Sequence, residues 1–438
     1  MMQQEDIREK SLKYSLMNGI FSNAMIGFFR DFLTPFILVL GANARQVGML
    51  NAIPNFLGSL GQLKSADLIG WMKSRKRVVN VFVLFEGAIL LSIAVAALFR
   101  KMEPSLLIVF IAVYALSSAM ITPALGSWIS DLIDIRVRGS FFGKRNRAYG
   151  FVAMGSTFLA GFILNQMKKI DPFYGFAVLF GIAFLFRMLG WVFIRKVHEP
   201  ALSYNKGEQF TIFAFLGHIK KSNFTRFVVF VSLFGFSVNI ASPFFAVLML
   251  KDLKFSYLLY TIMLISSALA RHLSISRWGE HADKVGNIKI IMFASVFIGV
   301  IPLLWIINRN PVFLVLVQIF SGFLWAGFNL CASNFIYDAA APEKRPRCIA
   351  YFNALNGIFL SAGAILGGFM LKALPGIFGY KILTLFLISA FLRFLAVFCM
   401  RPFIQEVRPV EKIGNKELFY SMINRSAVLG IERRTVKY

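Results

Sequence analysis

Long apolar stretches recur along almost the whole chain, and they limit the folds that it can adopt. Of the 438 residues, 58% are hydrophobic and only 16% are charged. A helix needs about 20 apolar residues to cross a bilayer. Because the stretches are continuously apolar and too long for barrel strands, we predict an all-α membrane protein with twelve transmembrane helices. The stretches lie at 14–39, 46–66, 78–99, 105–127, 147–167, 174–194, 223–250, 255–276, 288–307, 311–334, 348–371 and 377–400.

Positive charge is distributed unevenly among the connecting segments. The net charge is +26, and 34 of the 47 Lys and Arg residues lie in one alternating set of segments. By the positive-inside rule, this set and both termini face the cytoplasm. A nucleic-acid site would gather the charge on one soluble domain, so we expect no nucleic-acid partner. The basic segments are the N-terminus, 64–77, 128–147, 195–226, 271–289, 338–347 and the tail from 401.

The second half of the chain repeats charged positions of the first half. Asp131 and Arg138 recur as Asp338 and Arg345, each 207 residues later. Many secondary transporters consist of two such membrane halves with the substrate path between them. We therefore predict four regions. They are an N-terminal six-helix bundle at 1–194, a cytoplasmic linker at 195–222, a C-terminal six-helix bundle at 223–400 and a basic cytoplasmic tail at 401–438.

A run of glycines and charges separates the eighth and ninth apolar stretches. Gly279, Asp283, Lys284, Gly286 and Lys289 fit the pattern G-x-x-x-D-[RK]-x-G-[RK]-x-[RK], with Asn in place of one basic residue. Glycine lets helix ends approach closely, and an Asp there accepts hydrogen bonds from a helix N-terminus or pairs with Arg. The run resembles the loop motif of the major facilitator superfamily. The first four of these residues are therefore candidates for a cytoplasmic gate.

The corresponding N-terminal segment and the loops after the fourth and tenth stretches extend the resemblance. Asp67 is followed by a Gly and a basic cluster, although Leu68 and Trp71 depart from the motif. Arg138-Gly139 resembles the P-x-x-x-R-[GA] loop of the same superfamily, and Arg345 is its repeat. We expect the two arginines to pair with acids of the gate. The candidate partners are Asp67 and Asp283, or Asp131 and Asp338.

The resemblance implies two pseudo-symmetric six-helix bundles whose first, fourth, seventh and tenth helices line a central cavity. Ionisable groups within spans indicate function, since each is costly in a bilayer unless paired or hydrated. Arg30 and Asp31 in the first stretch are candidates for substrate or proton contacts; Arg30 could instead reach the membrane surface or pair with its neighbour. Glu86 is either a coupling group or a structural partner of a basic residue. Asn239, Trp325 and Asn329 are further substrate candidates.

Arg187 and Arg393 form another repeated pair, 206 residues apart in the sixth and twelfth stretches. The resemblance makes these helices peripheral, which favours a structural ion pair or a side chain that reaches the membrane surface.

The motifs that are missing narrow the function. No P-loop is present, which excludes an ATP-driven pump on this chain, and the three cysteines form no metal or disulfide pattern. We predict a secondary transporter of the cell membrane that moves a small solute by alternating access, as a monomer without cofactor, with a proton as candidate coupling ion. The alternatives are a membrane-embedded lipid-modifying enzyme, which needs clustered carboxylates such as Asp131 and Asp134, and a non-transporting sensor.

Overall fold

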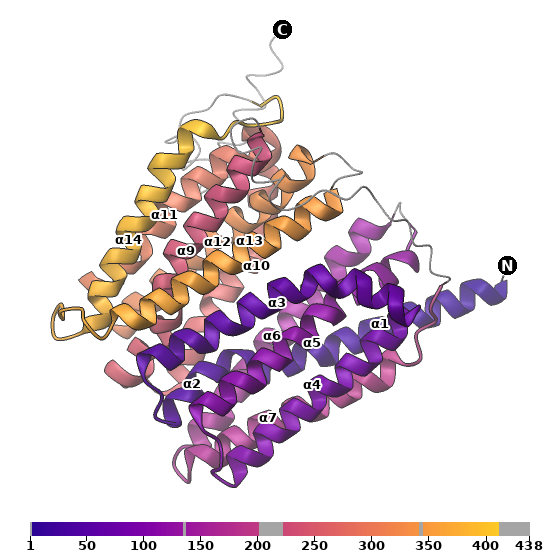
Figure 1. Ribbon diagram of the computed structural model, residues 1–438, viewed down its shortest axis with the longest axis horizontal. Helices are drawn as coiled ribbons and strands as arrows, with labels where there is room; N and C mark the ends of the chain where they lie inside the picture. Colours follow the sequence, from indigo (N-terminus) through magenta and orange to yellow (C-terminus); the bar gives the residue numbers. More distant parts are fainter. Residues whose placement is uncertain (1, 135–136, 201–221, 341–344, 411–438) are drawn as a thin grey trace.

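Two sets of helices, one from each half of the chain, lie side by side (Figure 1). The computed structural model describes residues 2–134, 137–200, 222–340 and 345–410, and the regular elements in these ranges are helices, which confirms the predicted all-α class. The N-terminal set is α1 (Met2–Phe29), η1 (Arg30–Phe32), α2 (Leu33–Val39), α3 (Ala44–Met72), α4 (Arg75–Leu98), α5 (Pro104–Asp131), α6 (Arg138–Met167) and α7 (Pro172–Ile194). The C-terminal set is α9 (Asn223–Val247), η2 (Leu248–Asp252), α10 (Tyr257–Val285), α11 (Asn287–Ile307), α12 (Pro311–Ala339), α13 (Arg345–Met370), α14 (Lys381–Met400) and η3 (Arg401–Phe403).

In the described part of the chain, ten helical segments are long and apolar enough to cross a membrane. The two remaining predicted stretches correspond to α3 and to the broken helix formed by α1, η1 and α2. Pro35 helps to explain the break, because a proline has no N–H for the carbonyl four residues earlier, that of Asp31. Tyr260 of α10 donates its hydroxyl to this carbonyl at 2.8 Å. A side chain of the other half thus satisfies a backbone group that the helix leaves open.

Side-chain caps explain where several helices begin. Asn43 and Gln46 form a reciprocal capping box at the start of α3, and Ser74 accepts a hydrogen bond from the Arg77 amide in α4. The helices also run beyond the apolar stretches into polar sequence. Helix α10 continues to Val285, so most of the glycine-containing motif that we expected in a loop is helical. Apolar stretches report bilayer thickness, whereas the helix ends where its hydrogen bonds end.

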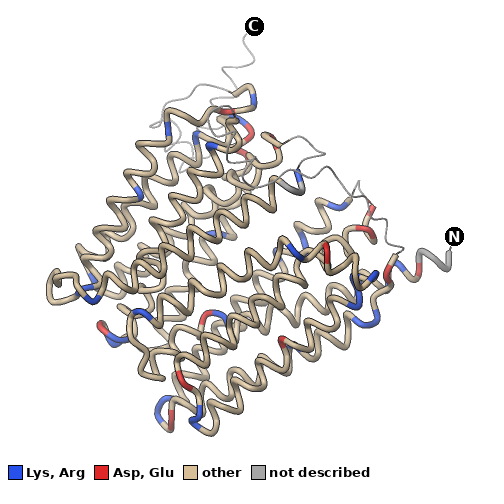
Figure 2. Tube along the Cα trace, viewed as in Figure 1, with Lys and Arg blue, Asp and Glu red and all other residues tan. Residues whose placement is uncertain are grey.

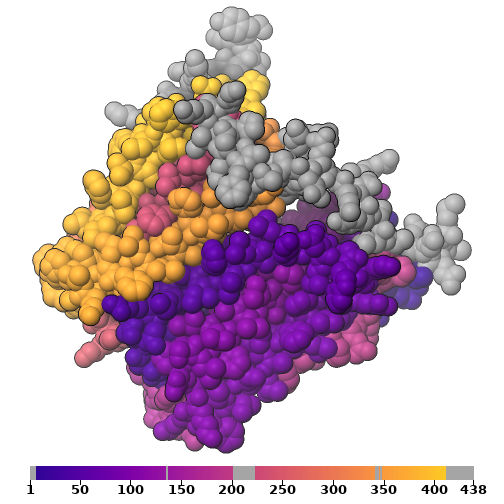
Figure 3. Space-filling model, viewed as in Figure 1, coloured from indigo at the N-terminus to yellow at the C-terminus, as the bar shows by residue number. Residues whose placement is uncertain are grey.

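The two halves meet tightly along α3 and α13, a seam that is visible in the space-filling view (Figure 3). A Cβ on Gly48 would lie 2.5 Å from the Ala364 carbonyl oxygen, and one on Gly368 would lie 2.9 Å from that of Ala44. Ser361 donates its hydroxyl across the seam to the Ala52 carbonyl at 2.8 Å. Small residues therefore bring the two backbones into direct contact, as is common between helices in membranes. A second contact between the halves joins α6 and α10.

Charged residues concentrate at the end of the bundle where α1 begins and α14 ends (Figure 2). We call this the basic end, and the other the opposite end. The first residues of α3, beside Gly368, lie at the opposite end, and its last residues lie at the basic end. The seam thus joins the halves near the opposite end and continues to Asn353 and Gln62, whose side-chain amides are 3.2 Å apart.

Candidate functional site

A central cavity of about 860 Å³ lies between the two halves. Helices of both halves contribute to its walls, and many of the lining side chains are polar or aromatic. Its size falls within the range that is usual for pockets that bind small molecules. The polar and aromatic lining includes Arg30, Asp31, Asn51, Asn55, Gln62, Tyr114, Ser118, Thr122, Ser242, Tyr260, Gln318, Trp325 and Arg393.

Arg30 and Asp31, both predicted site residues, lie at the helix break and line this cavity. Arg30 is exposed, whereas Asp31 is partly buried and accepts a hydrogen bond from the Thr157 hydroxyl of α6 at 3.3 Å. The charges of Arg30 and Arg271 both act on the Asp31 carboxylate. Asp31 therefore stands where the first helix meets α6 of its own half and α10 of the other half.

Glu86 is placed differently from Asp31. Its buried carboxylate forms an ion pair with Arg187 of α7 and accepts a hydrogen bond from Ser118 of α5. Ser22 of α1 accepts a further hydrogen bond from Arg187 at 3.0 Å. These contacts tie together four helices of the N-terminal half. Glu86 thus has the basic partner that we considered for it, and it reaches the cavity wall only through Ser118.

Arg393, which we expected in a peripheral structural role, is buried and yet lines the central cavity. It donates to the Ile298 carbonyl at 2.9 Å, to Ser389 Oγ at 3.2 Å and to the Val238 carbonyl at 3.5 Å. Pro302 lies four residues after Ile298 and cannot donate to its carbonyl. One guanidinium N–H thus takes the place of the missing helix hydrogen bond.

The substrate candidates of the C-terminal half lie around a second cavity of about 410 Å³. Asn239 and Asn329 line it, and Trp325 lies in the walls of both cavities. The Asn239 side chain donates to the Gly235 carbonyl of its own helix at 3.3 Å. Of these three predicted residues, the structure therefore brings only Trp325 to the central cavity together with Arg30 and Asp31.

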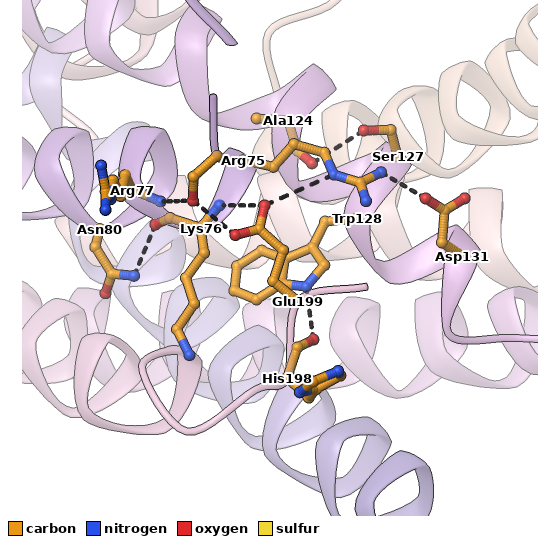
Figure 4. Close-up of polar contacts among 11 residues, drawn as sticks. Arg75, Lys76, Arg77, Asn80, Ala124, Ser127, Trp128, Asp131, His198 and Glu199 are labelled. Atoms are coloured by element: carbon orange, nitrogen blue, oxygen red, sulfur yellow. Dashed lines mark hydrogen bonds and ion pairs between the residues drawn. The ribbon is translucent and has the colours of Figure 1, made fainter. Parts of the chain in front are cut away.

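At the basic end of the N-terminal half, Glu199 organises a cluster of polar contacts (Figure 4). It accepts hydrogen bonds from the Lys76 amide at 3.1 Å and from Ser74 Oγ at 2.6 Å, at the start of α4. The mostly buried Arg75 pairs with Asp131 at 2.6 Å, and its Nε lies 3.9 Å from Glu199. A carboxylate at a helix N-terminus satisfies free amides and interacts favourably with the helix dipole.

The C-terminal half repeats this arrangement. Glu406, 207 residues after Glu199, accepts a hydrogen bond from the Ile288 amide at the start of α11, at 2.8 Å. It also occupies the space beside Gly286, whose φ of +88° favours glycine. Sequence reasoning missed both glutamates, although their spacing matches that of Asp131 and Asp338 and could have revealed them.

Arg408, in the chain segment after α14, connects two of the predicted gate acids. It donates to both carboxylate oxygens of Asp338 at 2.8 Å and to Asp283 at 3.2 Å. The hydrogen bond to Asp338 raises the pKa of Arg408, so the guanidinium stays charged. Asn287, the residue that departs from the motif, donates to the same carboxylate at 2.8 Å. Two predicted gate acids therefore meet at a residue that we had assigned to the tail.

The predicted pairing of Arg138 and Arg345 with these acids is wrong in this structure. Arg138 donates to the Ile133 carbonyl at 3.2 Å, and Arg345 donates to the Ala340 carbonyl at 3.4 Å and the Tyr337 carbonyl at 2.9 Å. Both arginines thus bind carbonyls at the end of the preceding helix, where a cation interacts favourably with the helix dipole. Gly139 follows in the first turn of α6, and a Cβ at this position would meet no other atom within 4 Å.

Asp67 does not occupy the position that corresponds to Asp283. Helix α3 ends at Met72 and α10 ends at Val285, so the residue that matches Asp283 is Gly70. Asp67 lies most of a turn earlier, and its exposed side chain is 3.5 Å from Lys64. The remaining gate candidates, Gly279 and Lys284, lie in the last two turns of α10. A role for these residues in gating stays a prediction.

Comparison with known protein families identifies the group to which these features belong. The family model of the Major Facilitator Superfamily matches residues 16–274 and 227–431. The chain belongs to the major facilitator superfamily. The two matches each begin in one half, in agreement with the repeat of charged positions. Membership of this superfamily points to membrane transport of a small molecule rather than to an enzyme, and the helices mark a multi-pass membrane protein.

Solved structures of several transporters share the fold. The nucleoside transporter NupG has 15% sequence identity and a TM-score of 0.68, over 91% of this chain and 98% of that chain. A POT family peptide transporter has 12% identity and a TM-score of 0.67, over 92% and 98%. A bacterial homolog of the human lysosomal transporter Spinster has 12% identity and a TM-score of 0.59, over 92% and 99%. At such identities the likeness concerns the fold alone. No curated protein matches the sequence.

Proposed function

We propose that this superfamily member is a secondary transporter that carries a small solute by alternating access, with its binding site in the central cavity. The observation that carries the proposal is the cavity itself, which helices of both halves line and which the α3–α13 seam borders toward the opposite end. Movement of the halves about this cavity would expose it to each side of the membrane in turn. A sensor that only kept the fold would not need such a polar lining.

The orientation follows from charge. Most of the Lys and Arg residues belong to the segments of the basic end. By the positive-inside rule, this end and both termini face the cytoplasm, and we propose the cell membrane as the location. At this end, the ion pairs of Asp131 with Arg75 and of Asp338 with Arg408 each stay within one half. At the opposite end, Gly48 and Gly368 contact the other half. This pattern supports a conformation that is open toward the cytoplasm.

Asp31 is the coupling group that the geometry favours over Glu86. Glu86 already has Arg187 as a counter-ion, whereas no Lys or Arg nitrogen of the described residues lies within 4.0 Å of the Asp31 carboxylate. Thr157 and Tyr260 contact Asp31 from α6 and α10, and the charges of Arg30 and Arg271 act on it. A proton that binds or leaves there changes the charge at a contact between the halves.

Accessibility of a cavity thiol from each membrane face tests alternating access without a known substrate. Ser242 lines the cavity and is exposed. We expect the Ser242→Cys thiol, in a protein whose native Cys331, Cys348 and Cys399 are replaced by Ser, to react with impermeant thiol reagents both in inverted and in right-side-out vesicles. Reaction from one face alone, under every imposed ion gradient, would contradict alternating access and favour a static scaffold.

The same reporter tests Asp31. If its proton drives the change between states, the ratio of the two accessibilities depends on pH, and Asp31→Asn fixes that ratio near its acidic value at every pH. The conservative variant Glu86→Gln should keep the pH dependence wherever it folds. A pH dependence that persists in the double variant Asp31→Asn, Glu86→Gln would rule out both carboxylates as coupling groups.

A further inference from the structure

Arg393 is a buried cation that lines the central cavity and has no carboxylate partner among the described residues. Its three hydrogen bonds go to two backbone carbonyls and one hydroxyl, all uncharged. No Asp or Glu oxygen of the described residues lies within 4.0 Å of its guanidinium. A guanidinium has five N–H donors, so two of them remain available. A buried charge that lacks a counter-charge is costly, and such groups are usually paired.

The N-terminal half provides an internal comparison. Arg187 occupies the equivalent position in α7 and is neutralised by Glu86 of α4. Helices α4 and α11 begin 212 residues apart, at Arg75 and Asn287, and the same offset relates Glu86 to Ile298. The arginine of each half therefore contacts an equivalent residue. One contact is a carboxylate, and the other is a neutral backbone carbonyl.

A purely structural role does not account for the charge of Arg393. The carbonyl that Pro302 leaves open needs only one N–H donor, which an uncharged amide side chain could provide without burying a charge. Arg393 lies seven residues before the end of α14, about 10 Å of helix rise from it. Its hydrogen bonds to α9 and α11 hold the guanidinium inside the bundle, beside the cavity, rather than at the membrane surface.

The central cavity contains more basic than acidic side chains. Among the described residues that line it, the acidic and basic side chains are Arg30, Arg393 and Asp31, two basic groups and one carboxyl group. Asp31 neighbours Arg30 in sequence and faces Thr157. The cavity therefore has space beside Arg393 and a missing negative charge. A guanidinium matches the geometry of a carboxylate or phosphate group better than any neutral ligand.

We propose that the solute carries a carboxylate or phosphate group and that Arg393 binds this group, with Arg30 as the second cation of the site. The inference rests on the proposed transport function and specifies its substrate class. The solute supplies the counter-charge that Glu86 supplies to Arg187 in the other half. Phe29 and Trp325, in the same cavity, offer apolar surface for its uncharged part.

The electrostatic potential of the cavity can be measured with the Ser242→Cys reporter, because Ser242 is one turn from Val238, whose carbonyl Arg393 contacts. Two thiol reagents of opposite charge are compared, sulfonatoethyl and trimethylammonioethyl methanethiosulfonate. Each rate is divided by its rate with mercaptoethanol. Changes in thiol ionisation affect both reagents alike and cancel in the ratio. We expect the anionic reagent to be favoured roughly tenfold, because positive charge exceeds negative charge in the cavity.

Variants test which side chain causes the preference for the anionic reagent. Arg393→Gln should lower the anion-to-cation ratio several-fold and Arg393→Lys should keep it, whereas loss of a purely structural guanidinium would not distinguish the two. Arg401→Gln, an exposed position just beyond the same helix, is the matched control and should leave the ratio unchanged. If Arg393→Gln does not elute from a size-exclusion column as a folded protein, Arg30→Gln tests the proposal instead. It should also lower the anion-to-cation ratio several-fold.

A ratio at or below one in the parent protein, or a ratio that neither Arg393→Gln nor Arg30→Gln lowers, overturns the anion proposal. The charge preference is read from the ratio of two reagents at one face, and alternating access is read from the comparison of two faces. A thiol that reacts from one face only, with a strong anion preference, would therefore contradict transport while supporting the anion site.

Discussion

Glu86 and Arg187 neutralise each other inside the N-terminal half, at a place where four helices converge. The pair is buried, so water cannot screen either charge once its partner is removed. Removing one partner of a buried pair usually costs about 3–5 kcal/mol, whereas replacing both with apolar residues is often neutral or stabilising. The pair therefore has a stability signature that distinguishes it from a coupling site.

We predict that Glu86→Gln lowers the free energy of unfolding by about 3–5 kcal/mol, because it leaves the Arg187 charge without a partner. The double variant Glu86→Leu, Arg187→Leu should lie much closer to the parent protein. Thermal and denaturant unfolding of purified protein in detergent, followed by tryptophan fluorescence, measures both. A Glu86→Gln protein that is as stable as its parent would contradict a structural ion pair and return Glu86 to the coupling candidates.

At the scale of elements, one carboxylate after the last helix of each half caps the third membrane-spanning helix of that half. Glu199 reaches the start of α4, and Glu406 reaches the start of α11. Each glutamate joins the segment that leaves its six-helix set to a helix inside the set. The basic end of each half is thereby fixed internally, which suits two bodies that move against each other.

Local hydrogen exchange should reveal this capping. Loss of a helix cap costs about 0.5–2 kcal/mol, so Glu406→Ala should speed amide exchange at the start of α11, and Glu199→Ala should do so at the start of α4. Each effect should stay within its own half. Glu280→Ala, at an exposed position of α10, is the control. Exchange that rises equally in both halves, or that the control reproduces, argues against local capping.

The sequence predicted the helices and the repeated aspartates better than it predicted which side chains contact one another. Asp131 and Asp338 stood out because equal spacing in two halves is improbable in generic polar loops. Glu199 and Glu406 share that spacing, yet an acid in a polar segment is unremarkable until the helix start that it caps is known. Arg408 escaped notice because its contacts with Asp338 are 70 residues away in sequence.

The offset between the halves also varies along the chain, which limits what a single spacing can predict. It is 207 residues for the aspartates but 213 between the ends of α3 and α10, at Met72 and Val285. Motif matching therefore aligned Asp67 with Asp283 incorrectly. Helix count and the two-bundle division depend on apolar length and repetition, which the sequence carries directly, whereas pairing depends on where each helix ends.

For the whole molecule, the α3–α13 seam is the contact that we expect to open if the protein works by the proposed alternating access. Gly48 has the Ala364 carbonyl oxygen where a Cβ would stand, at 2.5 Å, and backbone cannot move aside as a flexible side chain can. An added methyl group therefore raises the energy of this conformation without touching the cavity. In the proposed opposite conformation, a parted seam would have room for it. Overpacking of this kind costs about 1–3 kcal/mol, and each 1.4 kcal/mol changes a ratio of populations about tenfold.

We therefore predict that Gly48→Ala increases the reaction of the Ser242→Cys thiol from the opposite end and decreases it from the basic end. Gly70→Ala is the matched control, because it lies in the same helix with no atom near its Cβ position, so it should leave both rates unchanged. Measurements in inverted and right-side-out vesicles give the two rates. If Gly48→Ala slows both equally, the methyl group disturbs folding rather than the balance of states. If it changes neither, the seam is not the contact that parts, and the closure of the cavity must lie elsewhere, with the α6–α10 contact as the next place to test.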